Sequence, residues 1–117
     1  MDTEWQRIVK GERLTRDVFS AIADPTRRQL LDLLAAVDEL PLYEMTAQFP
    51  LGRTGVAKHL AILKEAGLVE DRKVGRESRY RLNAARLREV QEWVSFYEHF
   101  WIKRLDRLQD LLEEDNR

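Results

Sequence analysis

The spacing of apolar residues predicts three short helices in the first half of the chain. They are expected over residues 15–22, 25–37 and 42–49, where apolar residues recur at intervals of three and four. Asp24 followed by Pro25 combines an N-cap acceptor with proline at the first helical position, so the second helix begins there. The core side of this helix is expected to hold Leu30, Leu31, Leu34 and Val37.

A fourth helix, predicted from Arg53 to Ala66, has one apolar side and one small, polar side. Its apolar side is expected to be buried and holds Val56, Leu60 and Leu63, at positions i, i+4 and i+7. Its outer side carries Arg53, Thr54, Lys58 and Ala61. Because these residues combine hydrogen-bonding groups with short side chains, a helix that presents them can approach another surface closely.

Glycines accompany this helix at both ends and in its interior. Gly52 is expected at the N-cap and Gly67 at the C-terminal cap. The turn at residues 50–52 separates the helix from the short helix before it, which is the arrangement of a helix-turn-helix motif. Gly55 inside the helix costs about 1 kcal/mol relative to alanine, which indicates close approach of a backbone, either that of the preceding helix or that of DNA.

Residues 68–82 predict a β-hairpin. Polar and half-buried positions alternate toward its end, at Arg79, Tyr80, Arg81 and Leu82. Gly75-Arg76 is the Gly-X pair of a two-residue hairpin turn, so Arg76 is expected at the tip of a wing.

The last third of the chain predicts one long helix. Asn83 is a good N-cap, and the helix is expected to run from Ala84 to about Glu114, roughly 45 Å. A compact domain of this length is only about 35 Å across, so the helix overhangs. One apolar stripe comprises Leu87, Val90, Val94, Tyr97, Trp101, Leu105, Leu108 and Leu112, and a second set comprises Trp93, Phe96, Phe100 and Leu111.

This apolar surface exceeds what a single domain of this size covers, which favours a homodimer. At 117 residues the chain is one domain, small enough for oligomerisation to stabilise it. The residues expected at the dimer interface are Trp93, Val94, Tyr97, Phe100, Trp101, Leu105 and Leu108.

The charge distribution and the composition indicate which kinds of binding partner and which cellular location to expect. The net charge is −1, yet residues 52–81 carry eight Lys/Arg against four Asp/Glu, and the remainder carries twelve against seventeen. The basic segment mildly favours DNA. There is no cysteine, no signal-like segment and no apolar run of membrane-spanning length, so a cytoplasmic protein is expected.

Two motifs carry a family resemblance. Ala23-Asp-Pro-Thr-Arg-Arg, and Val56-Ala-Lys-His-Leu followed by Ala66-Gly-Leu-Val, resemble the arsenical-resistance repressor (ArsR) family. The resemblance implies a mainly α winged helix-turn-helix fold with a small β-hairpin and a long C-terminal dimerisation helix. It also implies a homodimeric repressor that places two recognition helices in successive major grooves of a palindromic operator.

The resemblance covers residues 15 to about 112 and assigns candidate DNA contacts; together with the weakly patterned N-terminus it divides the chain into three segments. Candidate groove contacts are Arg53, Thr54, Lys58 and His59, and candidate wing contacts are Arg76 and Arg79. Residues 1–14 form an N-terminal lead-in that is either a short amphipathic turn or a frayed end. Residues 15–83 form the DNA-binding part and residues 84–117 the C-terminal helix.

Other activities have less support. Many members of the family bind metals through cysteines in the third helix or through histidines and carboxylates in the last one, but residues 42–48 contain no thiolate, and His99 has no second histidine near it. The segment around Trp93–Trp101 instead resembles a branch that does not sense metal, so neither metal nor cofactor is expected. The chain contains no arrangement typical of an enzyme. The alternative is a winged-helix module for protein–protein interaction, which would expose large apolar groups on its recognition helix.

Overall fold

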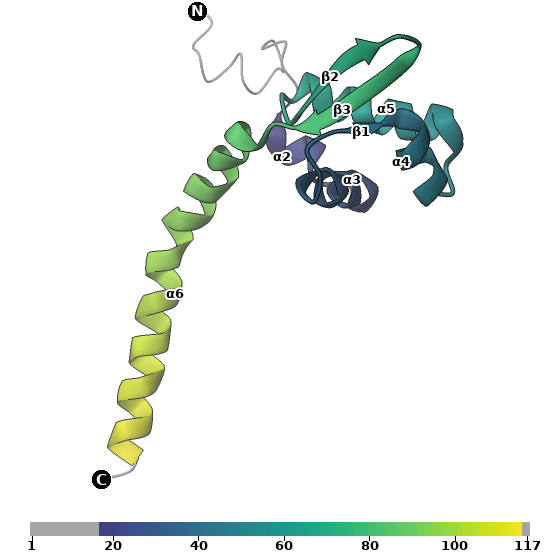
Figure 1. Cartoon of the computed structure of the whole chain (residues 1–117). Coiled ribbons are helices and arrows are strands. Elements are labelled where there is room, and N and C mark those ends of the chain that lie inside the picture. The colour runs from purple at the N-terminus through teal and green to yellow at the C-terminus, as the bar shows by residue number, and fades with distance from the viewer. Residues whose placement is uncertain (1–16, 116–117) are drawn as a thin grey trace, which may run out of the picture. The chain divides into compact units, whose positions relative to one another are not determined.

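The computed structural model describes residues 17–115, in two compact units that divide after Arg86. The first unit contains α2 (Val18–Ala21), α3 (Pro25–Ala35), β1 (Leu40–Pro41), α4 (Leu42–Gln48), α5 (Gly52–Glu65), β2 (Val69–Val74) and β3 (Glu77–Leu82) (Figure 1). The 3₁₀ helix η1 (Ala84–Leu87) leads into α6 (Arg88–Asp115). The chain is mainly helical, with a small antiparallel sheet and a long last helix, which confirms the predicted fold class. The expectation for residues 1–14 falls outside the described residues.

The sheet is antiparallel, with the order β1-β3-β2. Val74 pairs with Glu77 across the two-residue turn Gly75-Arg76, which confirms the predicted hairpin. Strand β1 was not predicted: Leu40 pairs with Tyr80 and Pro41 with Arg79. Two residues are too few to show the alternation by which strands are recognised in a sequence.

All fully buried apolar side chains of the described residues belong to the first unit. The largest are Leu30, Leu34, Met45, Leu60, Leu63, Leu68, Val18, Val56 and Val69. The predicted buried stripes of α3 and α5 are therefore confirmed, apart from one residue. Val37 was expected in the core but is 39% exposed, because α3 ends at Ala35 and the helical spacing no longer applies beyond it.

Side chains fix the junction between α2 and α3. The carboxylate of Asp24 caps α3, its Oδ2 accepting the backbone N–H of Arg27 at 3.0 Å, as predicted. This hydrogen bond holds the pKa of Asp24 below its ordinary value. Arg27 Nε donates to the carbonyl of Ala21 at 2.6 Å, and Arg28 Nη1 donates to that of Ile22 at 2.7 Å. The two arginines thus satisfy carbonyl groups at the end of α2 that no later helical turn can reach.

The ends of α5 depend on two glycines. Gly52 was expected as the N-cap, but Leu51 occupies that position and Gly52 begins the helix with φ +69°. At the other end Gly67 follows the C-cap with φ +76°, as predicted. Its N–H donates to Lys64 at 2.9 Å and that of Leu68 donates to Leu63 at 2.9 Å, the pair of hydrogen bonds that closes a helix with a left-handed residue.

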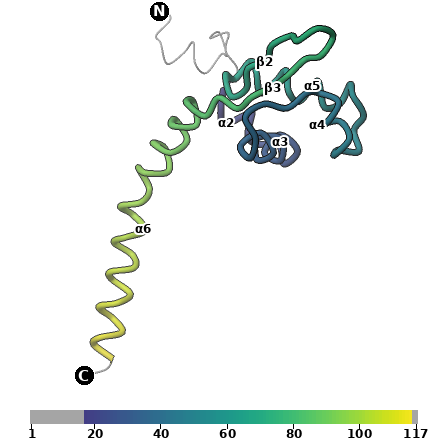
Figure 2. Tube along the Cα trace, in the orientation of Figure 1, coloured from purple at the N-terminus to yellow at the C-terminus, as the bar shows by residue number. Residues whose placement is uncertain are grey.

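Helix α6 is a single continuous helix of 28 residues, about 42 Å long (Figure 2). None of its residues is buried. Asn83 Oδ1 accepts the N–H of Ala85 at 3.3 Å, but the first turn after it is 3₁₀, so the α-helix begins four residues later than predicted. Within residues 17–115, no helix has both the length and the apolar character needed to cross a membrane.

Candidate nucleic-acid interface

Helices α4 and α5 form the predicted helix-turn-helix. Leu42 and Met45 are buried on α4, which ends before Phe49. The turn approaches α5 closely: a Cβ atom built on Gly55 would lie 2.8 Å from the Cβ of Leu51. The close neighbour of Gly55 is therefore the side chain of Leu51, the last residue before the helix, and not the backbone of the preceding helix that was expected.

The outer side of α5 is exposed at Arg53, Thr54, Lys58 and Ala61, opposite the buried Val56, Leu60 and Leu63. Leu51, which has no side-chain acceptor, stands at the N-cap position. The first turn of α5 therefore combines amide groups that no side chain caps with an exposed arginine.

Arg76 lies at the exposed tip of the hairpin. Gly75 adopts φ +62°, and no other residue type within residues 17–115 has positive φ, so this turn has its positive-φ residue in the first central position. A hollow of about 250 Å³ is lined by Arg76 of the tip, Arg53 of α5 and Tyr43 of α4. The structure thus brings together two of the predicted contacts that lie far apart in sequence.

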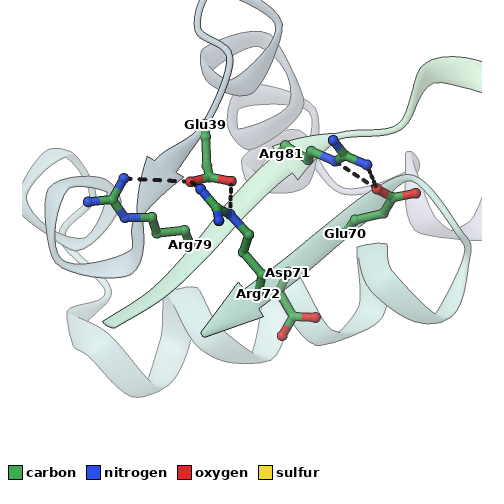
Figure 3. Close-up of a pocket in the computed structure, with 6 residues that line it drawn as sticks. All are labelled: Glu39, Glu70, Asp71, Arg72, Arg79 and Arg81. Atoms are coloured by element: carbon green, nitrogen blue, oxygen red, sulfur yellow. Dashed lines mark hydrogen bonds and ion pairs between the residues drawn. The ribbon is translucent and has the colours of Figure 1, made fainter. Parts of the chain in front are cut away.

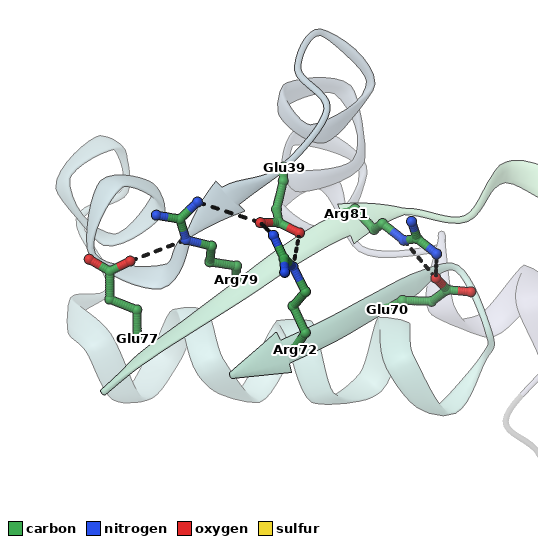
Figure 4. A network of polar contacts seen from close by, with 6 residues as sticks. All are labelled: Glu39, Glu70, Arg72, Glu77, Arg79 and Arg81. Carbon is green, nitrogen blue, oxygen red and sulfur yellow. Dashed lines mark hydrogen bonds and ion pairs between the residues drawn. The ribbon is translucent and has the colours of Figure 1, made fainter. Parts of the chain in front are cut away.

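Arg79 lies in a different environment, on a charged face of the sheet. Its Nε donates to Glu77 Oε2 at 3.2 Å, and its Nη1 lies 3.6 Å from Glu39 Oε1. Glu39 also accepts two hydrogen bonds from Arg72, at 2.6 and 2.9 Å, which hold the pKa of Glu39 below its ordinary value. Figure 3 shows Glu39, Arg72 and Arg79 on one face of the sheet, beside the pair of Arg81 and Glu70, and Figure 4 adds Glu77.

Helix α5 packs against the opposite face of the hairpin. Lys64 Nζ of the helix lies 2.8 Å from Asp71 Oδ1 of β2, and this pairing raises the pKa of Lys64. Tyr80, opposite Asp71 in the ladder, has its pKa raised by burial. The two faces of the hairpin therefore differ: one packs on α5 and the other presents paired charges.

His59 is half-buried and faces the start of α3. Its Nδ1 lies 3.4 Å from Arg27 Nη1 and 3.9 Å from Asp24 Oδ2. Since a guanidinium can only donate, Nδ1 acts as acceptor in the contact with Arg27. The contact joins the two motifs that carried the family resemblance, a link that sequence spacing does not reveal.

The residues that could hold a metal are dispersed. In the described part of the chain, no three or more histidine and carboxylate side chains form a group that could bind a metal ion. His99 lies on α6 beside Phe96, Phe100 and Lys103, none of which is a residue type that binds zinc in proteins.

A buried helix-turn-helix, an exposed outer face on its second helix and an adjoining hairpin define a winged helix-turn-helix protein. A helix-turn-helix domain family matches residues 22–72. The transcriptional repressor SdpR of Bacillus subtilis is 36% identical over 78 residues, which cover 67% of this chain and 86% of that protein. The arsenic resistance regulator ArsR1 of Pseudomonas putida is 39% identical over 77 residues, 66% of this chain and 57% of that protein.

Solved structures agree with these relatives. An ArsR-like transcriptional regulator from Rhodococcus sp. RHA1 is similar with a TM-score of 0.66 and 30% identity, covering 97% of this chain and 98% of that one. The chain belongs to the ArsR family of transcriptional regulators, with a DNA-binding helix-turn-helix.

Proposed function

We propose that the protein is a cytoplasmic homodimeric repressor that binds a palindromic operator and does not respond to metal ions. The observation that carries the proposal is the outer side of α5, where Arg53, Thr54 and Lys58 are exposed above a fully buried apolar side. Such a helix can enter a major groove without losing its packing on the domain.

The exposed residues would contact different parts of the DNA. Arg53, in the first turn of α5, is placed for a bidentate contact with guanine or for a phosphate. Thr54 would contact base edges, and Lys58 would contact mainly phosphate. Arg76 at the hairpin tip would reach the adjoining backbone or minor groove.

Arg79 and His59 are proposed contacts of smaller effect. The guanidinium of Arg79 already binds Glu77 and lies near Glu39, and the imidazole of His59 lies against Arg27. A contact with DNA would have to compete with these partners. We therefore expect Arg79→Ala and His59→Ala to weaken binding less than Arg53→Ala.

The dimer would form along α6. Leu87, Val94, Trp101 and Leu108 recur every seven residues, a spacing typical of a coiled-coil seam. Trp93 and Phe96 both make edge-to-face contacts with Tyr97, with ring centroids 5.3 and 5.1 Å apart, which gathers aromatic surface in the middle of the helix. The remaining proposed interface residues are Phe100 and Leu105, both exposed in the single chain.

The proposal is tested by titrating the protein against duplexes selected from a random library by the protein itself. We expect half-sites about one helical turn, roughly 34 Å, apart. Arg53→Ala should weaken binding by about 1–3 kcal/mol per half-site if the contact is bidentate to guanine. Arg88→Ala is the matched control, because it removes the same charge from the exposed start of α6.

Two outcomes would overturn the assignment. If both Arg53→Ala and Lys58→Ala bind like the parent at physiological salt, the outer face of α5 is not the contact surface. If the parent binds no duplex at any salt concentration, a protein–protein interaction module is the better description. A chelator and added zinc should each leave binding unchanged, and a metal-dependent loss would contradict that part of the proposal.

A further inference from the structure

The hollow between α4, α5 and the hairpin tip is lined by residues from all three elements. Arg53 and Arg76 come from two elements and line the same space of about 250 Å³. Within residues 17–115, neither guanidinium makes a hydrogen bond or an ion pair. The arginines on the charged face of the sheet differ, because Arg72, Arg79 and Arg81 are all bound to carboxylates.

Beside the apolar Leu42, the hollow is lined by side chains that can donate hydrogen bonds to an oxyanion. Tyr43 lies on α4, is 60% exposed and lines the same space, and its side chain carries a phenolic hydroxyl that can donate a hydrogen bond. Glu77 also lines the hollow, but its carboxylate accepts a hydrogen bond from Arg79, which offsets its charge. Guanidinium groups match the geometry of a phosphate with two parallel N–H donors, and a hydroxyl can supply one more.

We propose that this hollow, the arginine cleft, holds one phosphate of the DNA backbone between Arg53 and Arg76, with the Tyr43 hydroxyl as a further donor. The inference rests on the proposed function and adds Tyr43 to the contact surface. A strand of backbone separates the major groove from the neighbouring minor groove, so it passes between a helix in one and a hairpin tip at the other. Seated there, one phosphate fixes the register of the helix and the wing together.

A shared phosphate makes a specific prediction for the salt dependence. Each neutralised phosphate contributes about −0.9 to the slope of log affinity against log salt. Removing either arginine leaves the other on the phosphate, so Arg53→Ala and Arg76→Ala should each flatten the slope by less than one unit per half-site. The double variant should flatten it by about one unit, whereas two separate phosphates would give about two.

Neutral backbone substitutions locate the phosphate. Single methylphosphonates are placed along a duplex selected by the parent protein, and the affinity is measured at each position. We expect one position per half-site at which the parent loses about tenfold or more, and at which the double variant loses nothing further. Two different positions, one lost in Arg53→Ala and the other in Arg76→Ala, would overturn the shared site.

Tyr43→Phe tests the hydroxyl while it keeps the ring. We expect affinity to fall about threefold to tenfold with an unchanged melting temperature, and the methylphosphonate at the shared position to abolish that difference. Equal losses with and without the methylphosphonate would remove Tyr43 from the site. Arg88→Ala serves as the control and should match the parent throughout.

Two further results separate this inference from its alternatives. Inorganic phosphate at millimolar concentration and constant ionic strength should displace the duplex no better than chloride does. Strong displacement would make the cleft a site for a free anion instead. A parent that binds DNA with both arginines acting independently would refute the cleft alone, whereas a parent that binds no DNA would refute the proposed function.

Discussion

Helix α5 and helix α6 both carry apolar stripes at helical spacing, but the stripe of α5 is buried and that of α6 is exposed. Val56, Leu60 and Leu63 of α5 are fully buried against the rest of their unit. In α6 no residue is buried, and Phe96 is 75% exposed. The periodicity of a helix shows which side is apolar, but it does not show whether that side is covered by the same chain.

The difference assigns separate roles to the two helices. The stripe of α5 anchors it, so that its polar side can face outward without loss of packing. The stripe of α6 has no cover within its unit, and a contiguous apolar surface of this extent is typical of an interface. The proposed second copy of the chain would supply what the sheet and the other helices supply for α5.

The largest effect is expected from a substitution of Trp101, which lies on the exposed apolar stripe of α6. Replacing Trp101 with Asp places a charge in the proposed seam, and desolvating an unpaired charge is costly. We expect the dissociation constant of the dimer to rise on the order of a hundredfold or more, about 3 kcal/mol. Sedimentation velocity at micromolar concentration should then show a monomer.

His99→Asp is the matched control for this change, because residue 99 lies on the opposite side of α6 from the stripe. It should remain dimeric. A Trp101→Asp variant that sediments like the parent would mean that α6 does not form the interface.

Replacing a leucine by alanine in each helix distinguishes burial within one chain from burial in a dimer. Leu60→Ala removes a fully buried side chain and should destabilise the fold by about 2–5 kcal/mol at any protein concentration. Leu105→Ala removes an exposed one, so its effect should appear only through the dimer and should vary with concentration. Denaturant unfolding at two protein concentrations measures both, and a Leu105→Ala effect that does not depend on concentration would contradict the proposed role of α6.

A smaller effect is expected at the end of α5. Gly67→Ala forces a side chain onto a residue with φ +76°, and its Cβ would lie 2.8 Å from Arg86 Cδ. We expect a loss of about 1–2 kcal/mol, part of which Arg86→Ala should relieve if the contact matters. Thermal unfolding of the two single variants and the double variant separates the backbone cost from the contact.

The smallest effect is expected on acidification. The pKa values of Asp24 and Glu39 are lowered in the folded protein, by the N–H of Arg27 and by Arg72. A lowered folded pKa means that the contribution to stability is complete above the unfolded pKa and is lost as pH falls through the folded pKa. Melting temperature should therefore decline below about pH 4, and less steeply in Asp24→Asn, which can still cap α3 but does not titrate. An identical decline in both proteins would remove Asp24 as a contributor.

Part of the site could be predicted from the sequence. The positions of Arg53, Thr54 and Lys58 on the exposed side of α5 follow from the period of its apolar residues, and that of Arg76 follows from the Gly-X turn. The ion pair of Arg79 with Glu39 could not be predicted, because it depends on strand β1 joining the edge of β3, whereas Glu77 lies only two residues from Arg79 on the same strand. The contact of His59 with Arg27 and the place of Tyr43 beside the arginines depend in the same way on packing between distant segments.

Local interactions explain the features that could be predicted from the sequence alone: the helices, their apolar sides, the hairpin and the cap at Asp24. Each depends on hydrogen bonds and side-chain positions within about four residues, or on a turn of two. Three features emerged only in the folded structure: the exposure of Val37, the presence of Leu51 at the N-cap position of α5 and the cleft that Arg53 and Arg76 both line. These outcomes depend on where helices end and on which elements pack together, and a period in the sequence does not encode either.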